Sequence, residues 1–223
     1  MASNPSTRPS VYLTSFASFR KRYLSYDIKL SRPEKVSVAF LTFALAGFIG
    51  WLYEVLVACL EHGHLVLRGE NFLPWMNIYA FGALIIIPVV YRFRRSPLKL
   101  LFFSALLTGG IELIAGWALD ALGGGQRFWN YNHGIWLIGS INGYVCFLSV
   151  AIFTLFSLLL IYFLLPYIIY LSKTSHPRTF LILATLVFSL VLADELLNLT
   201  LRTLDLPRAK TFYTSLGLEY ADG

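Results

Sequence analysis

The feature that most restricts the fold is the run of residues 139–170, which contains no charged side chain. A helix needs roughly 20 apolar residues to cross a bilayer. This run is long enough to span and tilt, or to break near Pro166. Only 13% of the chain is charged and 57% is hydrophobic, whereas soluble domains carry about 25% charged residues. The composition excludes an ordinary soluble enzyme and a disordered chain, and it predicts an integral membrane protein.

Further apolar runs occupy residues 36–60, 74–91, 98–119 and 179–201. We therefore predict an all-α, polytopic membrane helix bundle of about five transmembrane helices over 36–201. A basic N-terminal segment (1–35) precedes the bundle, and a short tail (202–223) follows it. The alternating pattern of a membrane β-barrel is absent from the sequence. The run 74–91 is short for a span, so four helices are the alternative if this run is re-entrant.

Lys and Arg are distributed unevenly between the loops. The N-terminal segment and the loops 92–99 and 171–178 together hold 13 of them, and the alternate segments hold 5. Because basic loops stay in the cytoplasm, we predict a cytoplasmic N-terminus and an external tail. Aromatic residues alternate with basic ones over residues 11–26. This pattern predicts an amphipathic helix on the membrane surface, and a plain basic tail is the alternative.

Acidic residues occur in three of the apolar runs: Glu54, Glu112, and the pair Asp194 and Glu195. All three runs are predicted to cross from inside to outside, which places Glu54, Glu112 and Glu195 at similar depth in the outer half of the membrane. A charge at the centre of a membrane helix costs about 2.5–3.5 kcal/mol. We therefore predict that these carboxylates share an interior polar site. Snorkelling toward the outer interface is the alternative.

One arginine follows each of the first two acids in an external loop, Arg68 after Glu54 and Arg127 after Glu112. A guanidinium can form two parallel hydrogen bonds to a carboxylate, although each arginine could instead anchor at lipid head groups. The repeated offset suggests two tandem hairpins, 36–91 and 98–170. If the two acids face each other, Arg127 is the expected partner between them.

The glycine-rich loop 123–134 is rich in aromatic residues. These could form an interfacial belt, because Trp and Tyr favour the membrane surface. The alternative is that the loop lines a pocket above Glu112 through Trp129, Asn130, Tyr131 and His133. The phosphate-binding patterns GxxxxGK[ST] and GxGxxG and the hydrolase pattern GxSxG are absent from the sequence. An ATPase activity within this chain is therefore not expected.

Neither a cofactor nor a metal ion is expected. Cys59 and Cys146 both lie inside apolar runs, no CxxC motif is present, and the four histidines lack the spacing of a zinc site. The expected partners are membrane lipids, and a second copy of the chain or a separate transport subunit. The net charge of +6 is read as loop charge that sets orientation, so no nucleic acid is expected.

Several short motifs together resemble a known family. In chain order they are Gly50-Trp-Leu-Tyr-Glu54, Arg68-Gly69, Tyr79-Ala-Phe-Gly82, Glu112 with Gly116, Phe128-Trp-Asn-Tyr131 and Gly143-Tyr-Val-Cys146. They are similar to the type IV ABC-transporter permease family, the CmpB-like group that includes the vertebrate transmembrane protein 229 proteins. The resemblance covers about residues 40–170. The family usually has Asp at position 130 and Gly at position 80, where this chain has Asn and Ala.

The resemblance implies a multi-pass transport protein of the plasma (inner) membrane and leaves the substrate open. The first hypothesis is a permease or channel-like component. The second is a membrane enzyme acting on a lipid or isoprenoid, with Glu54 and Glu112 as general acid and base. The third is a structural subunit. In addition to Glu54 and Glu112, we predict that the following residues bind the substrate: Tyr53, Arg68, Arg127, Trp129, Asn130, Tyr131, His133, Asp194 and Glu195.

Overall fold

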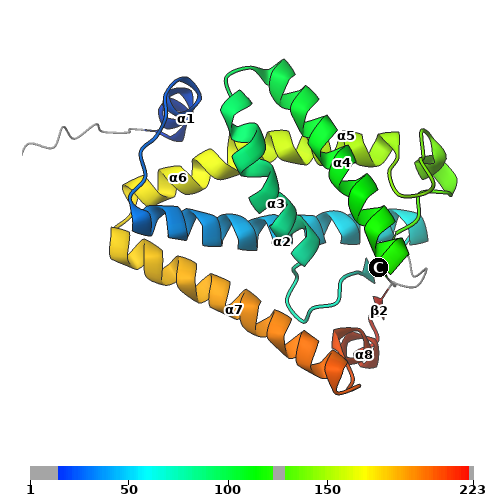
Figure 1. Ribbon diagram of the computed structural model, residues 1–223. Coiled ribbons are helices and arrows are strands. Elements are labelled where there is room, and N and C mark those ends of the chain that lie inside the picture. The colour runs from blue at the N-terminus through cyan, green and yellow to red at the C-terminus, as the bar shows by residue number, and fades with distance from the viewer. Residues whose placement is uncertain (1–14, 123–128, 221–223) are drawn as a thin grey trace, which may run out of the picture.

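A computed structural model describes residues 15–122 and 129–220 of the chain. They form a helical bundle (Figure 1), which confirms the predicted all-α class. The helices are α1 (Phe16–Ser25), α2 (Arg32–His62), α3 (Asn77–Val90), η1 (Tyr91–Phe93), α4 (Pro97–Leu122), η2 (Gly134–Leu137), α5 (Phe147–Leu159), η3 (Leu160–Leu164), α6 (Leu165–Thr174), α7 (Pro177–Thr203) and α8 (Ala209–Ser215). Two short strands, β1 (Val66–Leu67) and β2 (Glu219–Tyr220), pair in parallel.

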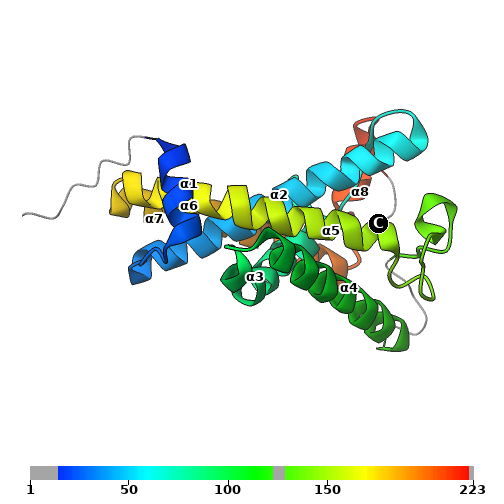
Figure 2. The same ribbon diagram turned by 90° about the horizontal axis from the view of Figure 1, so that it is seen from above.

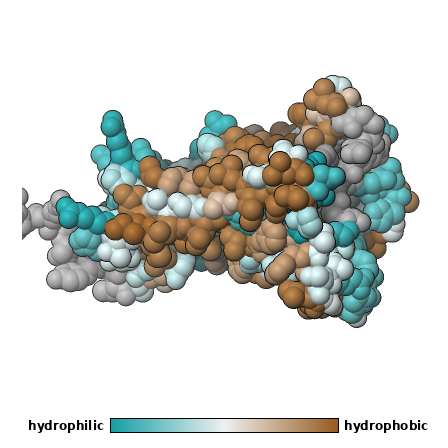
Figure 3. Space-filling view, turned by 90° about the horizontal axis from the view of Figure 1, so that it is seen from below, coloured by the Kyte–Doolittle hydropathy of each residue, from teal (hydrophilic) through white to brown (hydrophobic). Residues whose placement is uncertain are grey.

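Four helices of the described ranges are long and apolar enough to cross a membrane: α2, α4, the continuous helix Phe147–Thr174, and α7. Large apolar side chains are exposed along all of them. Figure 3 shows an apolar band along the length of the bundle, with hydrophilic residues gathered at both ends. An apolar surface of this extent requires lipid around it, so the chain is a multi-pass membrane protein.

The helices that carry the acids run in one direction. In Figure 1, α2, α4 and α7 run from the end where α1 lies toward the end where α8 and β2 lie, and α3 and α5–α6 return. Glu54, Glu112 and Glu195 each lie 8–10 residues before the last residue of their helix, or about 12–15 Å at 1.5 Å per residue. Each acid therefore lies in the second half of its helix, and the common depth of the three acids in the membrane stays a prediction.

The run 139–170 does not break at Pro166. Instead α5 passes through the π-helical turn η3 and continues as α6. Proline has no N–H and its ring collides with the carbonyl four residues earlier, so a regular α-helix is strained at this point. The wider π turn relieves the strain, with the N–H of Leu165 donating to the carbonyl of Leu160.

The run 74–91 is the one that does not form a full span. Its helix α3 has 14 residues, which is about 21 Å and shorter than the bilayer core of about 30 Å. An extended segment, residues 68–76, leads back from the end of α2 to the middle of the bundle, where the N–H of Met76 donates to the carbonyl of Gly47. The described residues thus contain four long apolar helices and one shorter helix that follows the segment 68–76. This count matches the alternative of four spans with a re-entrant run, and not the expected five.

The predicted N-terminal helix is present as α1, but its apolar side is covered by protein. Phe19 and Tyr23 are 1% and 0% exposed, and Phe16 and Phe19 pack on the rings of Tyr167 and Tyr170 in α6. The guanidinium of the buried Arg94, after η1, donates to the carbonyl of Tyr23 and to Asp27. Helix α1 is therefore fastened across one end of the bundle (Figure 2).

The C-terminal segment is held at the opposite end by a pH-sensitive contact. Beside the β1–β2 pair, Nε2 of His64 lies 2.6 Å from a carboxylate oxygen of Glu219. The hydrogen bond and the charge of Glu219 raise the pKa of His64 above its usual value of 6.5. The ion pair is fully present below that usual value, and it is lost as the pH rises through the raised pKa.

We expect Glu219→Gln to return the pKa of His64 toward the usual value, because the negative partner is removed while the shape is kept. An NMR titration of the His64 ring measures this shift. His133 lies outside this contact, so the NMR signals of its ring serve as the internal control and should be the same in the parent and the variant. An unchanged titration of His64 would contradict the ion pair.

Candidate functional site

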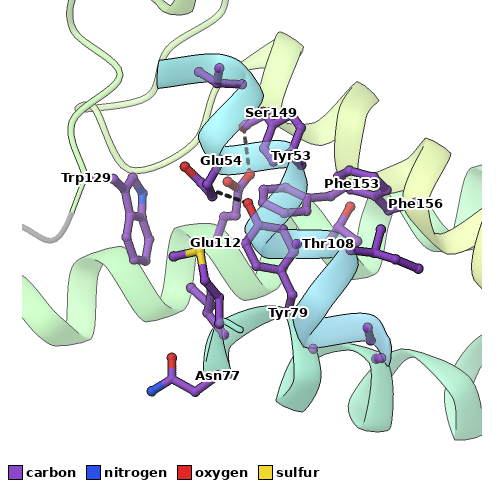
Figure 4. A pocket seen from close by; sticks show the side chains of 18 of the residues that line it. Tyr53, Glu54, Asn77, Tyr79, Thr108, Glu112, Trp129, Ser149, Phe153 and Phe156 are labelled. Carbon is purple, nitrogen blue, oxygen red and sulfur yellow. Dashed lines mark hydrogen bonds between the residues drawn. The ribbon is translucent and has the colours of Figure 1, made fainter. Parts of the chain in front are cut away.

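A cavity of about 1140 Å³ lies between α2, α3, α4 and α5. It extends from Phe16 and Tyr167 near the α1 end of the bundle to Arg68 and His133 near the opposite end. Glu54 and Glu112 both line it, and Figure 4 shows their side chains directed into the same space. The structure therefore brings together the two acids that the sequence singled out.

Glu54 is held by donors from two directions. The Tyr79 hydroxyl of α3 donates to its Oε1, and Nη1 of Arg68 donates to its Oε2 at 3.0 Å. The second guanidinium nitrogen, Nη2, lies 3.9 Å from Glu61. The predicted pairing of Arg68 with Glu54 is thus present, and the charge of Glu54 is balanced inside the bundle. The role of either residue in substrate binding stays a prediction.

Tyr79 reaches Glu54 because α2 and α3 pack closely through glycines. A Cβ atom built on Gly50 would lie 2.1 Å from Cγ of Tyr79, and one built on Gly47 would lie 2.0 Å from Nε1 of Trp75. No side chain larger than hydrogen fits at either position. Small residues of this kind let the backbones of membrane helices approach each other.

Glu112 has a different environment. It is 9% exposed, and its oxygens accept hydrogen bonds from the Ser149 hydroxyl at 2.7 Å and the Tyr131 hydroxyl at 2.9 Å. Among the described residues, no Lys, Arg or His forms an ion pair with it. Burial and the Glu112 carboxylate raise the pKa of the Tyr131 phenol. Tyr131 therefore remains a neutral donor, and among the described residues no basic side chain balances Glu112 when its carboxyl group is ionised.

The aromatic loop residues lie on the cavity wall as predicted for the pocket alternative: Trp129, Asn130, Tyr131 and His133. The indole N–H of Trp129 donates to the carbonyl of Tyr144 at 2.8 Å, and the ring of Tyr131 stacks on Trp136. Arg127, the expected partner between the two acids, lies outside the described residues. Tyr53 also lines the cavity, between the two carboxylates and the rings of α5.

Asp194 and Glu195 are used in another way. The two oxygens of Asp194 accept from the backbone N–H groups of Phe72 and Leu73, and Glu195 accepts from the side chains of Asn71 and Asn77. Neither acid is on the wall of the cavity in the described part of the chain. The two acids accept hydrogen bonds from donors of the re-entrant segment, whose backbone N–H groups have no partners within a helix. The predicted contact of these acids with a substrate stays a prediction.

Two residues of this site were not among the sequence-based candidates. Tyr79 stands in a quoted family motif but carried no sign that it contacts Glu54, 25 positions earlier. Ser149 lies in an uncharged apolar run, where nothing in the sequence distinguishes it from the other small residues. These hydroxyls reach the acids only through the packing of α2 on α3 and of α4 on α5. The contacts therefore depend on tertiary structure and leave no pattern in the local sequence.

The described residues form a polytopic membrane helix bundle with two carboxylates on the wall of the cavity between α2, α3, α4 and α5. The chain belongs to the family described as "Putative ABC-transporter type IV", whose model matches residues 41–199. The match extends beyond residue 170, where the motif resemblance ended, and includes Asp194 and Glu195. No curated protein and no solved structure matches the chain.

Proposed function

We propose that this chain is a permease or channel-like transport component whose central cavity is the solute path. The observation that carries the proposal is the Glu112 carboxylate, buried at the cavity wall with two neutral hydroxyl donors and no basic partner among the described residues. An acid inside a membrane bundle is costly, and such residues mark ion and substrate pathways.

The two carboxylates support different roles. Arg68 and Tyr79 already satisfy Glu54, so Glu54 fixes the position of α3 and the re-entrant segment. The Glu112 carboxylate, when ionised, attracts a cation or a proton from the cavity. The absence of nucleotide-binding motifs from the sequence makes the step ion-coupled, passive, or driven by a separate ATPase subunit.

A membrane enzyme is the second candidate, favoured by the hydroxyl of Ser149 that donates to Glu112 at 2.7 Å. A carboxylate placed against a hydroxyl has the geometry of general-base chemistry. In that case a lipid substrate would occupy the cavity, and expression of the chain would change the cellular lipid extract. The same Glu112→Gln substitution would abolish that change.

The test is charge movement in proteoliposomes perfused with sodium, potassium or tetramethylammonium ions. We expect a current with at least one of these cations, lowered about tenfold or more in Glu112→Gln, since neutralising one close charge removes well over 1.4 kcal/mol of attraction at low effective dielectric. Glu219→Gln is the matched control, because this carboxylate lies outside the cavity, and its current should be unchanged. Absence of current for all three cations, or a current unaffected by Glu112→Gln, would refute the proposal.

A further inference from the structure

The wall of the cavity changes character along its length. Toward the α1 end it is lined by apolar side chains of α1, α3, η3 and α6, among them Phe16, Ile86, Leu160 and Phe163. Toward the opposite end the lining holds the charged residues and the amides. Figure 4 shows the carboxylates between the two regions, with Phe153 and Phe156 on one side and Trp129 on the other. The chamber is therefore amphipathic along its axis.

The polar region carries an excess of negative charge. The described lining residues include four acids, Glu54, Glu61, Glu70 and Glu112, and two arginines, Arg68 and Arg202. The Tyr131 hydroxyl donates to Glu112, and the rings of Tyr131 and Trp129 both line this region of the cavity. Acidic groups and aromatic faces both attract a cation, and aromatic faces suit a quaternary ammonium in particular. An anionic group such as a phosphate would meet net repulsion in this region.

The apolar region, which we call the tube, is suited to an alkyl chain. Its described lining residues on α1, α3, η3 and α6 carry no charge, and the hydroxyls of Thr108 and Ser157 donate to carbonyls of their own helices. Helix α1 closes the end of the tube, since Phe16 is a lining residue and packs on Tyr167. An alkyl chain that enters from the polar region would be buried there against apolar side chains.

We propose that the cavity takes an amphiphilic cation, a single apolar chain that ends in an ammonium or quaternary ammonium group. The head group lies at Glu112 among the aromatic rings, and the chain extends past Ala83 toward η3. This inference rests on the proposed function, because it names the substrate class of the same cavity.

The test is equilibrium binding of decyltrimethylammonium to the full chain in nanodiscs, with empty nanodiscs subtracted. We expect saturable binding of decyltrimethylammonium. Tetramethylammonium should compete for the site with an affinity at least about tenfold lower than that of decyltrimethylammonium, because the short cation lacks the chain. Decanoate, an anion with an equally long chain, should not displace it. These competitions use the unaltered protein, so they do not depend on the folding of any variant.

Variants separate the head from the chain. Glu112→Gln should weaken binding of decyltrimethylammonium about tenfold, Glu112→Asp should retain most of it, and Glu219→Gln should not change it. Ala83→Phe, which fills the tube, should remove the advantage of the decyl chain and leave tetramethylammonium unaffected. Displacement by decanoate, or equal binding by Glu112→Gln, would overturn the inference. Cation currents without amphiphile binding would overturn only this inference, and binding without currents would overturn only the proposed transport.

Discussion

Replacing Gly50 with leucine is expected to destroy the contact between α2 and α3 and to lower the free energy of unfolding by about 3 kcal/mol or more, at the upper end of overpacking effects. A Cβ at position 50 would lie 2.1–2.5 Å from three atoms of Tyr79. The Tyr79 hydroxyl is bonded to Glu54 and its ring packs on Tyr53 and Phe153, and one of the three close atoms is its Cβ, which rotation of the side chain cannot move away. The helices must therefore separate.

The measurement is thermal unfolding of purified protein in detergent, together with the elution profile in size-exclusion chromatography. Gly82→Leu and Gly110→Leu are matched controls, because both glycines lie inside helices and a Cβ there meets nothing within 4 Å. Leucine is also a better helix former than glycine, so the controls should be as stable as the parent or slightly more stable. A Gly50→Leu variant as stable as these controls would show that close α2–α3 packing does not hold the bundle.

Much of the fold could be predicted because hydropathy along the chain reports burial in lipid directly. The apolar runs located the long helices, and the alternation of basic loops predicted that α2, α4 and α7 run in one direction. The exception was the run 74–91. Its hydropathy is that of a span, but Pro74 and the polar residues before it belong to a re-entrant segment. Asp194, more than 100 positions away, accepts two of its N–H groups, and a contact this distant in the chain cannot be read from local hydropathy.

The candidate site was predictable to the extent that charge is costly in a membrane. Glu54 and Glu112 stood out because few acids occur in apolar runs, and Arg68 stood out because it is the sole base of its loop. The partners of Glu112 did not stand out, since a tyrosine and a serine are ordinary in any loop or helix. The backbone contacts of Asp194 were not predictable for the same reason: the sequence shows that an acid is costly, but not whether it binds a substrate or a backbone.

The pairing of Arg68 with Glu54 leads to the second large effect. Arg68→Leu is expected to destabilise the protein by about 2–3 kcal/mol, below the 3–5 kcal/mol of a fully buried pair because both side chains are about one-fifth exposed. The loss arises because Glu54 keeps its charge with the Tyr79 hydroxyl as its remaining donor in the described structure. Glu54→Gln should cost less, since Arg68 can turn toward Glu61, 3.9 Å away.

The double variant Arg68→Leu with Glu54→Gln should be more stable than Arg68→Leu alone, because no unpaired charge is left in the bundle. Chemical denaturation in detergent gives the four free energies of the cycle, and we expect a coupling energy of about 1–3 kcal/mol. The matched cycle combines Arg68→Leu with Glu61→Gln. The contact between Arg68 and Glu61 is longer and more exposed than the one between Arg68 and Glu54, so this cycle should show weak coupling. Flux should not return in the double variant, since Tyr79 and the re-entrant segment lose the charged anchor that orders the cavity wall. Additive effects of Arg68→Leu and Glu54→Gln within about 0.5 kcal/mol would mean that the pair is a geometric neighbour and does not hold the re-entrant segment in place.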